Sequence, residues 1–358
     1  MRFFETIADM GHEQVVLCHD KATGYRGVIA IHDTTLGPAL GGCRFWNYAT
    51  DEDAITDALR LSRGMTYKNA VAGLNLGGGK SVIIGDNKTV NREMLFRAHG
   101  RFVDSLGGRY VTAEDVGTTV EDMDFVHMET KYVTGIGSKS GDPSSVTAHG
   151  VFRAIQASAC ERWGHDSLDG RTVAIQGCGH VGYHLAVELH KAGALLVVTD
   201  IDATRIQRVV DATGAKVVAL TEIYGVKADI FAPCALGGVL NDDTIPQLQV
   251  EIVSGAANNQ LLEDRHGDEL EAKGILYAPD YVVNAGGVIN VYSELTGWSR
   301  ERSLRKADEI YHTVLSVFRL AKETHIPTYK AADRVAEQRI KAVRGMLQTW
   351  PQYPNRET

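Results

Sequence analysis

The fold is decided by the stretch Gly177-Cys178-Gly179-His180-Val181-Gly182. It follows the apolar run Thr172–Gln176, opens an amphipathic helix predicted over 177–190, and precedes a second apolar run that ends at Asp200. A G-x-G-x-x-G sequence between a strand and a helix, followed by an acid at the end of the next strand, is typical of a dinucleotide-binding β-α-β unit. The alternative, a glycine-rich turn without a ligand, leaves this context unexplained.

Each part of this loop has its own physical role. Gly177 permits the tight turn, Gly179 lets the backbone approach a pyrophosphate, and Gly182 lets helix and strand pack closely. The helix N-terminus offers backbone N–H groups to the phosphates. Asp200 can accept hydrogen bonds from ribose hydroxyls and would repel a 2′-phosphate. We therefore expect residues 177–182 and Asp200 to bind NAD, while the nearby Arg205 keeps NADP as an alternative.

The sequence around this unit predicts two α/β domains. Later apolar runs alternate with helical segments, which favours an open, doubly wound parallel sheet of the Rossmann type. We read these later strands at 228–233, 251–255 and 276–284. A length of 358 residues suits two domains. We place the seams so that residues 1–134 plus 332–358 form one α/β domain and residues 135–331 form the nucleotide-binding domain.

The N-terminal part combines strands with a helix. Thr50, with Asp53 three residues later, predicts a helix start, and Gly64 is expected to end that helix. Short apolar runs predict strands at 15–18, 27–31, 81–84 and 109–112.

Composition excludes several classes of function. The formal net charge is −8, so binding to a nucleic-acid backbone is not expected. The five cysteines form no C-x-x-C pair, which is typical of reduced thiols in the cytoplasm. We find neither a signal-peptide pattern nor an apolar run long enough for a membrane span.

Two lysines and one aspartate carry the chemistry of the N-terminal part. Lys80 follows three glycines and enters an apolar strand, where burial would lower its pKa toward the range of a general base. Lys68 would add a second positive charge, and Asp115 follows a predicted strand. The alternative is that both lysines are solvated surface groups. A phosphate-binding loop ending at Lys80 is excluded, because Leu74 stands where that pattern needs glycine.

Several separate motifs resemble those of the glutamate, leucine, phenylalanine and valine dehydrogenase superfamily, and most of all the leucine dehydrogenases. The resemblance covers nearly the whole chain. It rests on DTTLGPALGG (33–42), MTYKNA (65–70), GGGK (77–80), AEDVGTT (113–119), APCALGG (232–238), GAANNQ (255–260) and NAGG (284–287).

The resemblance implies a role for each matching residue. Lys68 would bind the substrate α-carboxylate, Lys80 would handle the protons of water and carbinolamine, and Asp115 would be its partner. The positions implied around the nicotinamide are Thr147, Asn258, Asn259 and Asn284. The positions implied at the substrate are Leu40, Gly41, Gly42, Met65, Ala113, Val288 and Val291. The first domain would be catalytic, and the family commonly forms homo-oligomers, often octamers.

The resemblance also bears on the substrate. Glutamate-specific members place a lysine where this chain has Leu40, so a glutamate side chain would be left unpaired. The apolar pocket positions suit leucine, valine or isoleucine, with phenylalanine or tryptophan as the alternative, because pocket volume discriminates weakly. Tyr292 is a bulky residue near this pocket whose effect stays open.

Two other readings were weighed. His180 and His184 have a spacing able to bind a metal, but no third ligand accompanies them, so no metal is expected. A non-catalytic NAD-binding homologue would be expected to lose Lys80 or Asp115, and both are present.

Overall fold

The computed structural model describes residues 2–89, 91–137 and 143–349, and it comprises two compact units. Unit one consists of residues 1–141 and 336–358, and unit two of residues 142–335. Residues 138–142 lie at the predicted first seam and residues 350–358 at the end of the predicted first domain. Both segments fall outside the described residues.

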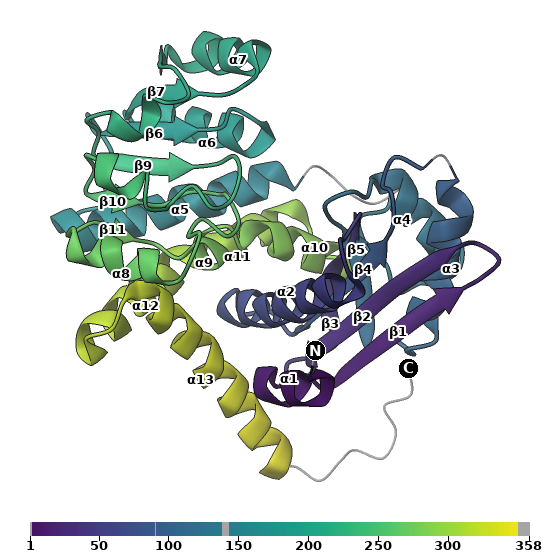
Figure 1. The fold of residues 1–358 in the computed structure, drawn as a ribbon. Coiled ribbons are helices and arrows are strands. Elements are labelled where there is room, and N and C mark those ends of the chain that lie inside the picture. The colour runs from purple at the N-terminus through teal and green to yellow at the C-terminus, as the bar shows by residue number, and fades with distance from the viewer. Residues whose placement is uncertain (1, 90, 138–142, 350–358) are drawn as a thin grey trace. The chain divides into compact units, whose positions relative to one another are not determined.

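Unit one is built on a five-stranded mixed sheet with the order β1-β2-β4-β3-β5 (Figure 1). Strands β1 and β2 pair antiparallel and β2 is antiparallel to β4, whereas β4, β3 and β5 run parallel. Helix α2 packs on one face through Ala54, Ala58 and Leu59, and helices α3 and α4 pack on the other. The elements are α1 (Phe3–Met10), β1 (Gln14–Asp20), β2 (Tyr25–Asp33), β3 (Ala39–Trp46), α2 (Asp51–Val71), β4 (Gly77–Ile84), α3 (Arg92–Asp104), β5 (Tyr110–Glu114), α4 (Val120–His127) and the residues of α13 (Thr328–Thr349) from 336 onward.

Two expectations for unit one are corrected. Helix α2 begins after Thr50, whose side chain accepts a hydrogen bond from the Asp53 amide, but it continues through Gly64 to Val71. An exposed glycine weakens a helix by only about 1 kcal/mol, and the last two turns bury Thr66, Asn69 and Ala70. Strand β3 was not predicted, because glycines interrupt its apolar pattern.

Unit two contains a six-stranded, wholly parallel sheet with the order β11-β10-β9-β6-β7-β8 (Figure 1). Counted from β6, this is the strand order of dinucleotide-binding Rossmann folds, so the predicted fold class is confirmed. The elements are α5 (Ser144–Trp163), β6 (Thr172–Gln176), α6 (His180–Lys191), β7 (Leu195–Thr199), α7 (Ala203–Thr213), β8 (Lys216–Val217), η1 (Ile223–Gly225), β9 (Ile230–Pro233), η2 (Ile245–Gln247), β10 (Ile252–Val253), α8 (Arg265–Ala272), β11 (Leu276–Tyr277), α9 (Asp280–Val283), α10 (Gly286–Thr296), α11 (Arg300–Asp308), α12 (Ile310–Thr324) and the start of α13.

The strand predicted at 276–284 is wrong in its second half. Strand β11 ends at Tyr277, and Pro279 precedes the short helix α9. The Asp280 carboxylate accepts a hydrogen bond from the Gln260 amide at 2.8 Å, which fixes the start of that helix. A local polar contact of this kind is not visible in an apolar run.

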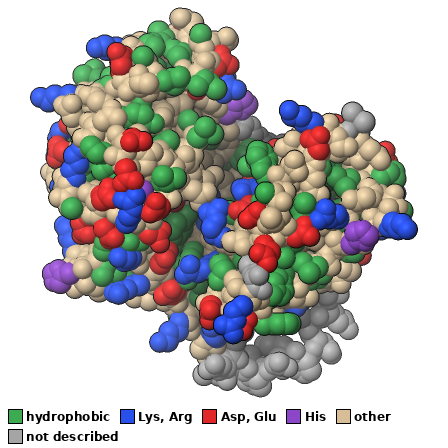
Figure 2. Space-filling model, in the orientation of Figure 1, with side chains coloured by type: hydrophobic (Ala, Val, Ile, Leu, Met, Phe, Trp, Pro, Cys, Tyr) green, Lys and Arg blue, Asp and Glu red, His purple; other side chains and the backbone are tan. Residues whose placement is uncertain are grey.

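The charged side chains at the surface and the state of the cysteines match the expectations from composition. On the face drawn in Figure 2, acidic and basic side chains of the described residues are interspersed. All five cysteines are free thiols. No helix within the described ranges is long and apolar enough to cross a bilayer.

Candidate active site

Lys80 lies in the middle of β4 and is almost completely buried, with 6% of its surface exposed. Its ammonium donates a hydrogen bond to the Asp115 carboxylate. The pKa of Lys80 is lowered to about 7, chiefly by burial and then by the positive charges of Arg44 and Lys68. A lysine with such a pKa exchanges a proton near neutral pH, which is the property a general base needs.

Asp115 is held in place by the turn that follows β5. Its backbone N–H donates to Thr118 Oγ1 at 2.8 Å, and the Thr118 amide donates back to the Asp115 carbonyl at 3.1 Å. Gly117 has φ +82°, a conformation that favours glycine. The Thr118 hydroxyl also donates to the Cys43 carbonyl of β3 at 3.1 Å, so the turn is fastened to the neighbouring strand.

The register of the parallel strands gathers the predicted residues of unit one on one face of the sheet. Leu40 lies opposite Gly78 of β4 and Gly42 lies opposite Ala113 of β5. Because side chains alternate along a strand, Leu40, Lys80 and Ala113 point to the same side, the side that α2 covers. Met65 and Lys68 lie in the later part of α2, and both are half-buried.

The glycines of β3 and β4 allow close approach within the unit itself. A Cβ at Gly41 would lie 1.7 Å from the Gly79 carbonyl oxygen, and a Cβ at Gly42 would lie 2.7 Å from Cβ of Asp115. A Cβ at Gly78 would collide with Thr66 of α2. The glycines before Lys80 therefore serve the packing of β4 against its neighbours.

In the glycine loop of unit two, two glycines are required by close packing and a third leaves open space. Gly177 has φ +105°, and a Cβ at Gly182 would lie 2.0 Å from the Gly177 carbonyl oxygen, so both positions are needed for the tight turn and the helix packing. A Cβ at Gly179 would meet nothing within 4 Å. Open space at the N-terminus of α6 fits the approach of a pyrophosphate group.

Asp200 stands at the carboxyl end of β7 and is tied to the same loop. One carboxylate oxygen accepts the Cys178 amide at 2.6 Å and the other accepts the Asp202 amide at 2.9 Å. The Cys178 thiol is buried, and burial raises its pKa to about 12. Cys178 therefore acts as a small buried side chain. His180 and Val181 form the first turn of α6.

A polar group lies beside the start of α10. Asn284 Nδ2 donates to Asn258 Oδ1 at 2.8 Å and to the Ala256 carbonyl at 3.1 Å. Asn284 Oδ1 is buried and has no hydrogen-bond partner within the described part of the chain. An orphaned acceptor of this kind fits an amide donor such as a carboxamide group. The adjacent Asn259 has φ +51°.

Three further predicted residues lie on helices of unit two. The Thr147 hydroxyl of α5 donates to the Pro143 carbonyl at 2.9 Å. Val288 and Val291 lie on α10, the first buried and the second half-buried. Tyr292 packs its ring edge-on against Trp298, with centroids 5.0 Å apart.

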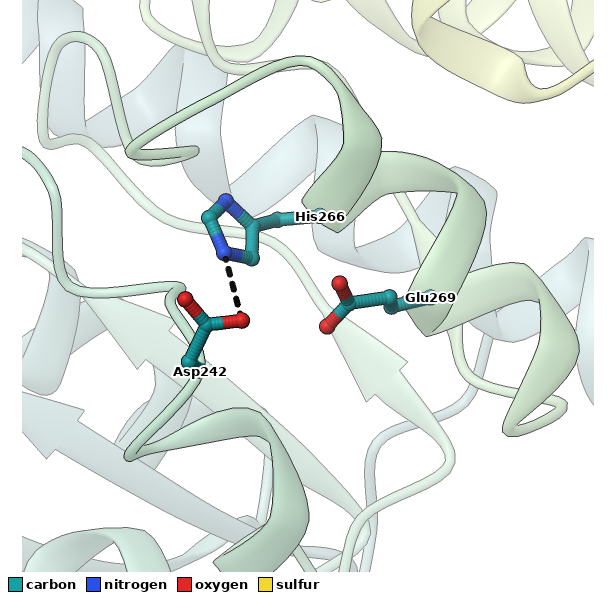
Figure 3. A group of neighbouring side chains, drawn as sticks. All are labelled: Asp242, His266 and Glu269. Carbon is teal, nitrogen blue, oxygen red and sulfur yellow. Dashed lines mark ion pairs between the residues drawn. The ribbon is translucent and has the colours of Figure 1, made fainter.

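A cluster of possible metal ligands is internally paired. Candidate atoms of Asp242, His266 and Glu269 lie within 4.8 Å of one another (Figure 3). Arg265 pairs with both carboxylates, at 2.6 Å to Asp242 and 2.8 Å to Glu269. His266 Nδ1 lies 3.0 Å from the Glu263 amide and 3.1 Å from the Glu263 carbonyl, and its Nε2 lies 3.5 Å from Asp242. We interpret the group as an ion-pair network.

Sequence reasoning misses two charged residues beside Lys80. Arg44 of β3 pairs with Asp57 of α2 at 2.8 Å, and its Nε lies 3.7 Å from Asp115. Arg44 comes two residues after Gly42 and Asp57 is one of several acids on a helix. No local signal marks Arg44, because β3 is not recognisable as a strand from the sequence pattern.

The chain is similar over almost its whole length to characterised dehydrogenases. A family model described as Glu/Leu/Phe/Val dehydrogenase, dimerisation domain, matches residues 12–132, and one described as Glutamate/Leucine/Phenylalanine/Valine dehydrogenase matches residues 137–345. The leucine dehydrogenase of Geobacillus stearothermophilus is 57% identical over 96% of this chain and 95% of the relative. The valine dehydrogenase of Streptomyces coelicolor is 52% identical over 93% of each chain.

Solved structures give the same picture. The crystal structure of L-tryptophan dehydrogenase from Nostoc punctiforme superimposes with a TM-score of 0.88 at 50% identity, covering 96% of this chain and all of that chain. A hetero-hexameric glutamate dehydrogenase from Thermus thermophilus has a TM-score of 0.76 at 23% identity, covering 97% of this chain and 93% of the other, and shares the fold.

Proposed function

Because the chain belongs to the glutamate, leucine, phenylalanine and valine dehydrogenase family, we propose that it oxidatively deaminates branched-chain L-amino acids, leucine first, with NAD. The products are the 2-oxo acid and ammonia, and the reaction is reversible. The observation that carries the proposal is the buried Lys80 against Asp115, on the sheet face that also holds Leu40 and Ala113.

Three residues of the chain are assigned separate roles in the proposed reaction. Lys68 holds the α-carboxylate of the amino acid. Bound NAD would supply the acceptor for the hydride that leaves Cα. Lys80 in its neutral form takes a proton from the water that adds to the resulting iminium carbon, and Asp115 exchanges protons with the carbinolamine as its C–N bond breaks. A pKa of about 7 lets Lys80 act as base and then as acid near neutral pH.

The nucleotide site is proposed to hold NAD. Gly179 leaves space at the N-terminus of α6 for the pyrophosphate, and the loop residues 177–182 surround it. Asp200 has both oxygens fixed by backbone amides, so its negative charge stays where a ribose hydroxyl would bind and a 2′-phosphate would be repelled. Asn284, with Asn258, Asn259 and Thr147, is proposed to face the nicotinamide.

We favour leucine over glutamate because of Leu40, and over aromatic substrates because a leucine dehydrogenase is 57% identical to this chain and a tryptophan dehydrogenase 52%. Leu40 is buried and apolar, so a substrate carboxylate beside it would lack a partner. Gly41, Gly42, Met65, Val288 and Val291 are proposed to complete the substrate site with Leu40 and Ala113. Tryptophan is the second candidate, because an L-tryptophan dehydrogenase of Nostoc punctiforme is 52% identical over 95% of this chain.

The protein is further proposed to be a cytoplasmic homo-oligomer, with the octamer of related enzymes as the first candidate. The description of the N-terminal family model as a dimerisation domain supports self-association, and five free thiols suit a reducing compartment. Light scattering after size-exclusion chromatography would measure the subunit number.

The test is an initial-rate assay of reduced nicotinamide at alkaline pH. The substrates are L-leucine, L-valine, L-isoleucine, L-phenylalanine, L-tryptophan and L-glutamate, each with NAD⁺ and NADP⁺. We expect the highest kcat/KM with leucine and NAD⁺, and little turnover of glutamate. A preference for tryptophan would overturn the substrate proposal, and a preference for NADP⁺ would overturn the role of Asp200.

A further inference from the structure

A chain of partly buried charges continues from the buried Lys80 and its partner Asp115. Arg44 lies on β3, between the strand that carries Lys80 and the strand that leads into Asp115. Its Nη1 pairs with Asp57 Oδ2 at 2.8 Å, and its Nε lies 3.7 Å from Asp115 Oδ2. The same Asp115 oxygen accepts the hydrogen bond from Lys80. One carboxylate oxygen is therefore approached by two cations from two neighbouring strands.

Arg44 is oriented by groups that have no contact with the reacting atoms. Asp57 accepts hydrogen bonds from Tyr48 at 2.6 Å and from Arg60 at 3.1 Å, in addition to its pair with Arg44. Arg44 Nε is buried and, within the described residues, makes no hydrogen bond. An N–H donor that is buried and directed at a carboxylate 3.7 Å away is placed for a closer contact with that carboxylate.

We propose that Arg44 is a positioning residue of the reaction: its permanent positive charge, held by Asp57, stands beside the Asp115 oxygen that also binds Lys80 and tunes the Lys80–Asp115 pair. This inference rests on the proposed function and names a residue that the function itself does not require. A guanidinium stays charged at any pH at which the enzyme works, so its influence is constant.

Some charged residues near Lys80 lower its pKa and others raise it. The positive charges of Arg44 and Lys68 lower the pKa of Lys80, whereas the negative charge of Asp57 raises it. Asp115 is in direct contact with Lys80. Removing Arg44 should therefore raise the pKa of Lys80, and removing the charge of Asp57 should lower it. These opposite signs distinguish an electrostatic role from general damage to the fold.

The experiment compares four single variants of the full chain. Arg44→Met removes the charge at similar length, Arg44→Lys keeps it, Asp57→Asn removes the opposing charge, and Arg26→Met is the matched control. Arg26 of β2 is exposed and pairs with Asp51, not with Asp57 or Asp115. Thermal unfolding establishes that each variant is folded, and the pH profile of kcat/KM for leucine deamination is the first readout.

The expected results are specific in sign and size. In Arg44→Met the acidic limb of the profile moves up by about one pH unit, so kcat/KM at pH 7 falls several-fold. Arg44→Lys restores most of the position of that limb, Asp57→Asn moves it down, and Arg26→Met leaves it in place. A folded Arg44→Met enzyme with an unchanged profile would overturn the proposal, as would an Arg44→Lys enzyme that shifts as far as Arg44→Met.

A second readout does not depend on turnover. The rate at which acetic anhydride modifies Lys80, measured by mass spectrometry of the Lys80 peptide at a series of pH values, titrates the amine directly. If the enzyme deaminated none of the amino acids, the proposed function would fail, but this titration would still test Arg44. The midpoint should rise in Arg44→Met and fall in Asp57→Asn. Equal midpoints in all variants would overturn the role of Arg44.

Discussion

At the scale of single residues, Lys80 shows how a protein can keep a lysine inside a sheet. Burial disfavours the charged ammonium, while contact with Asp115 compensates part of that charge. The resulting pKa of about 7 lies more than three pH units below the ordinary value of 10.5. A lowered pKa of this kind is typical of an acid–base group at a functional site.

Replacing Lys80 should remove catalysis and leave nucleotide binding intact. In Lys80→Ala we expect kcat/KM to fall by about 10²- to 10⁴-fold, the usual contribution of a general acid–base group. The dissociation constant for NADH, measured by fluorescence, should stay within about twofold, because the residues proposed to bind it lie in unit two. The exposed Lys88→Ala is the matched control. Wild-type turnover in Lys80→Ala would show that another group is the base.

The pH dependence of the wild-type enzyme should report the same group. The neutral amine is the base, so kcat/KM should rise with pH up to about 7 and then level, unless another group titrates. Below pH 7 the slope of log kcat/KM should be about one. An activity that falls as pH rises from 6 to 8 would contradict the assignment of Lys80 as the base.

At the scale of elements, what could be predicted followed from local patterns. Lys80 and Asp115 could be singled out because each stands next to an apolar run, and the loop at 177–182 because its glycines fall between a strand and a helix. Strand β3 could not be predicted, because two consecutive glycines, Gly41 and Gly42, are typical of a loop. Only the structure shows that they allow close packing against Gly79 and Asp115. Arg44 stayed hidden for the same reason: its strand was unrecognised.

Helix α2 rests on two buried histidines, and this should make the protein sensitive to acid. His12 Nε2 contacts the Leu59 carbonyl at 3.0 Å and Ser62 Oγ at 2.8 Å, and the His12 ring packs edge-on against His32. Burial, with a smaller effect of His32, lowers the pKa of His12 from 6.5 to about 4. The unfolded chain therefore takes up a proton at higher pH than the folded chain does.

The sign of the effect follows from that difference. As pH falls from 6.5 to 4, the free energy of unfolding should decrease by about 1.4 kcal/mol per pH unit, or about 3 kcal/mol in total, from His12 alone. His12→Gln can keep the donor to Leu59 but cannot ionise, so its stability should depend less on pH. Urea unfolding at pH 7.0, 5.5 and 4.5 measures this, with the exposed His19→Gln as control. Equal pH dependence in all three proteins would exclude His12 as the cause.

At the scale of the whole molecule, the two units differ in how the chain builds them. Unit one is assembled from residues 1–141 and the chain from 336 onward, whereas unit two is one continuous segment. Arg339 of α13 donates hydrogen bonds to the carbonyls of Ala70 and Leu74, so the C-terminal helix holds the end of α2. The sequence-based domain boundaries rest on the point at which predicted strands and helices begin to alternate regularly. The division of roles between the units remains a prediction.

Continuity gives unit two a property that unit one lacks: residues 142–335 should fold alone and bind NAD. Its sheet is wholly parallel, and its core residues, including Phe231, Leu240 and Leu270, come from that segment. A cut after Val335 keeps the hydrogen bond between Tyr281 and Asp333 at 2.7 Å, so the first turns of α13 stay attached. The isolated segment contains the loop 177–182 and Asp200 but neither Lys80 nor Asp115.

We therefore expect a cooperative thermal transition and an NADH dissociation constant within about threefold of that of the full chain, with no turnover of leucine. Circular dichroism and calorimetric titration would measure both quantities. Asp200→Ala in the same segment is the control, since it should weaken binding of NADH while the segment stays folded. A folded segment that fails to bind NADH would show that unit one supplies a necessary part of the nucleotide site, and the assignment of cofactor binding to unit two would have to be abandoned.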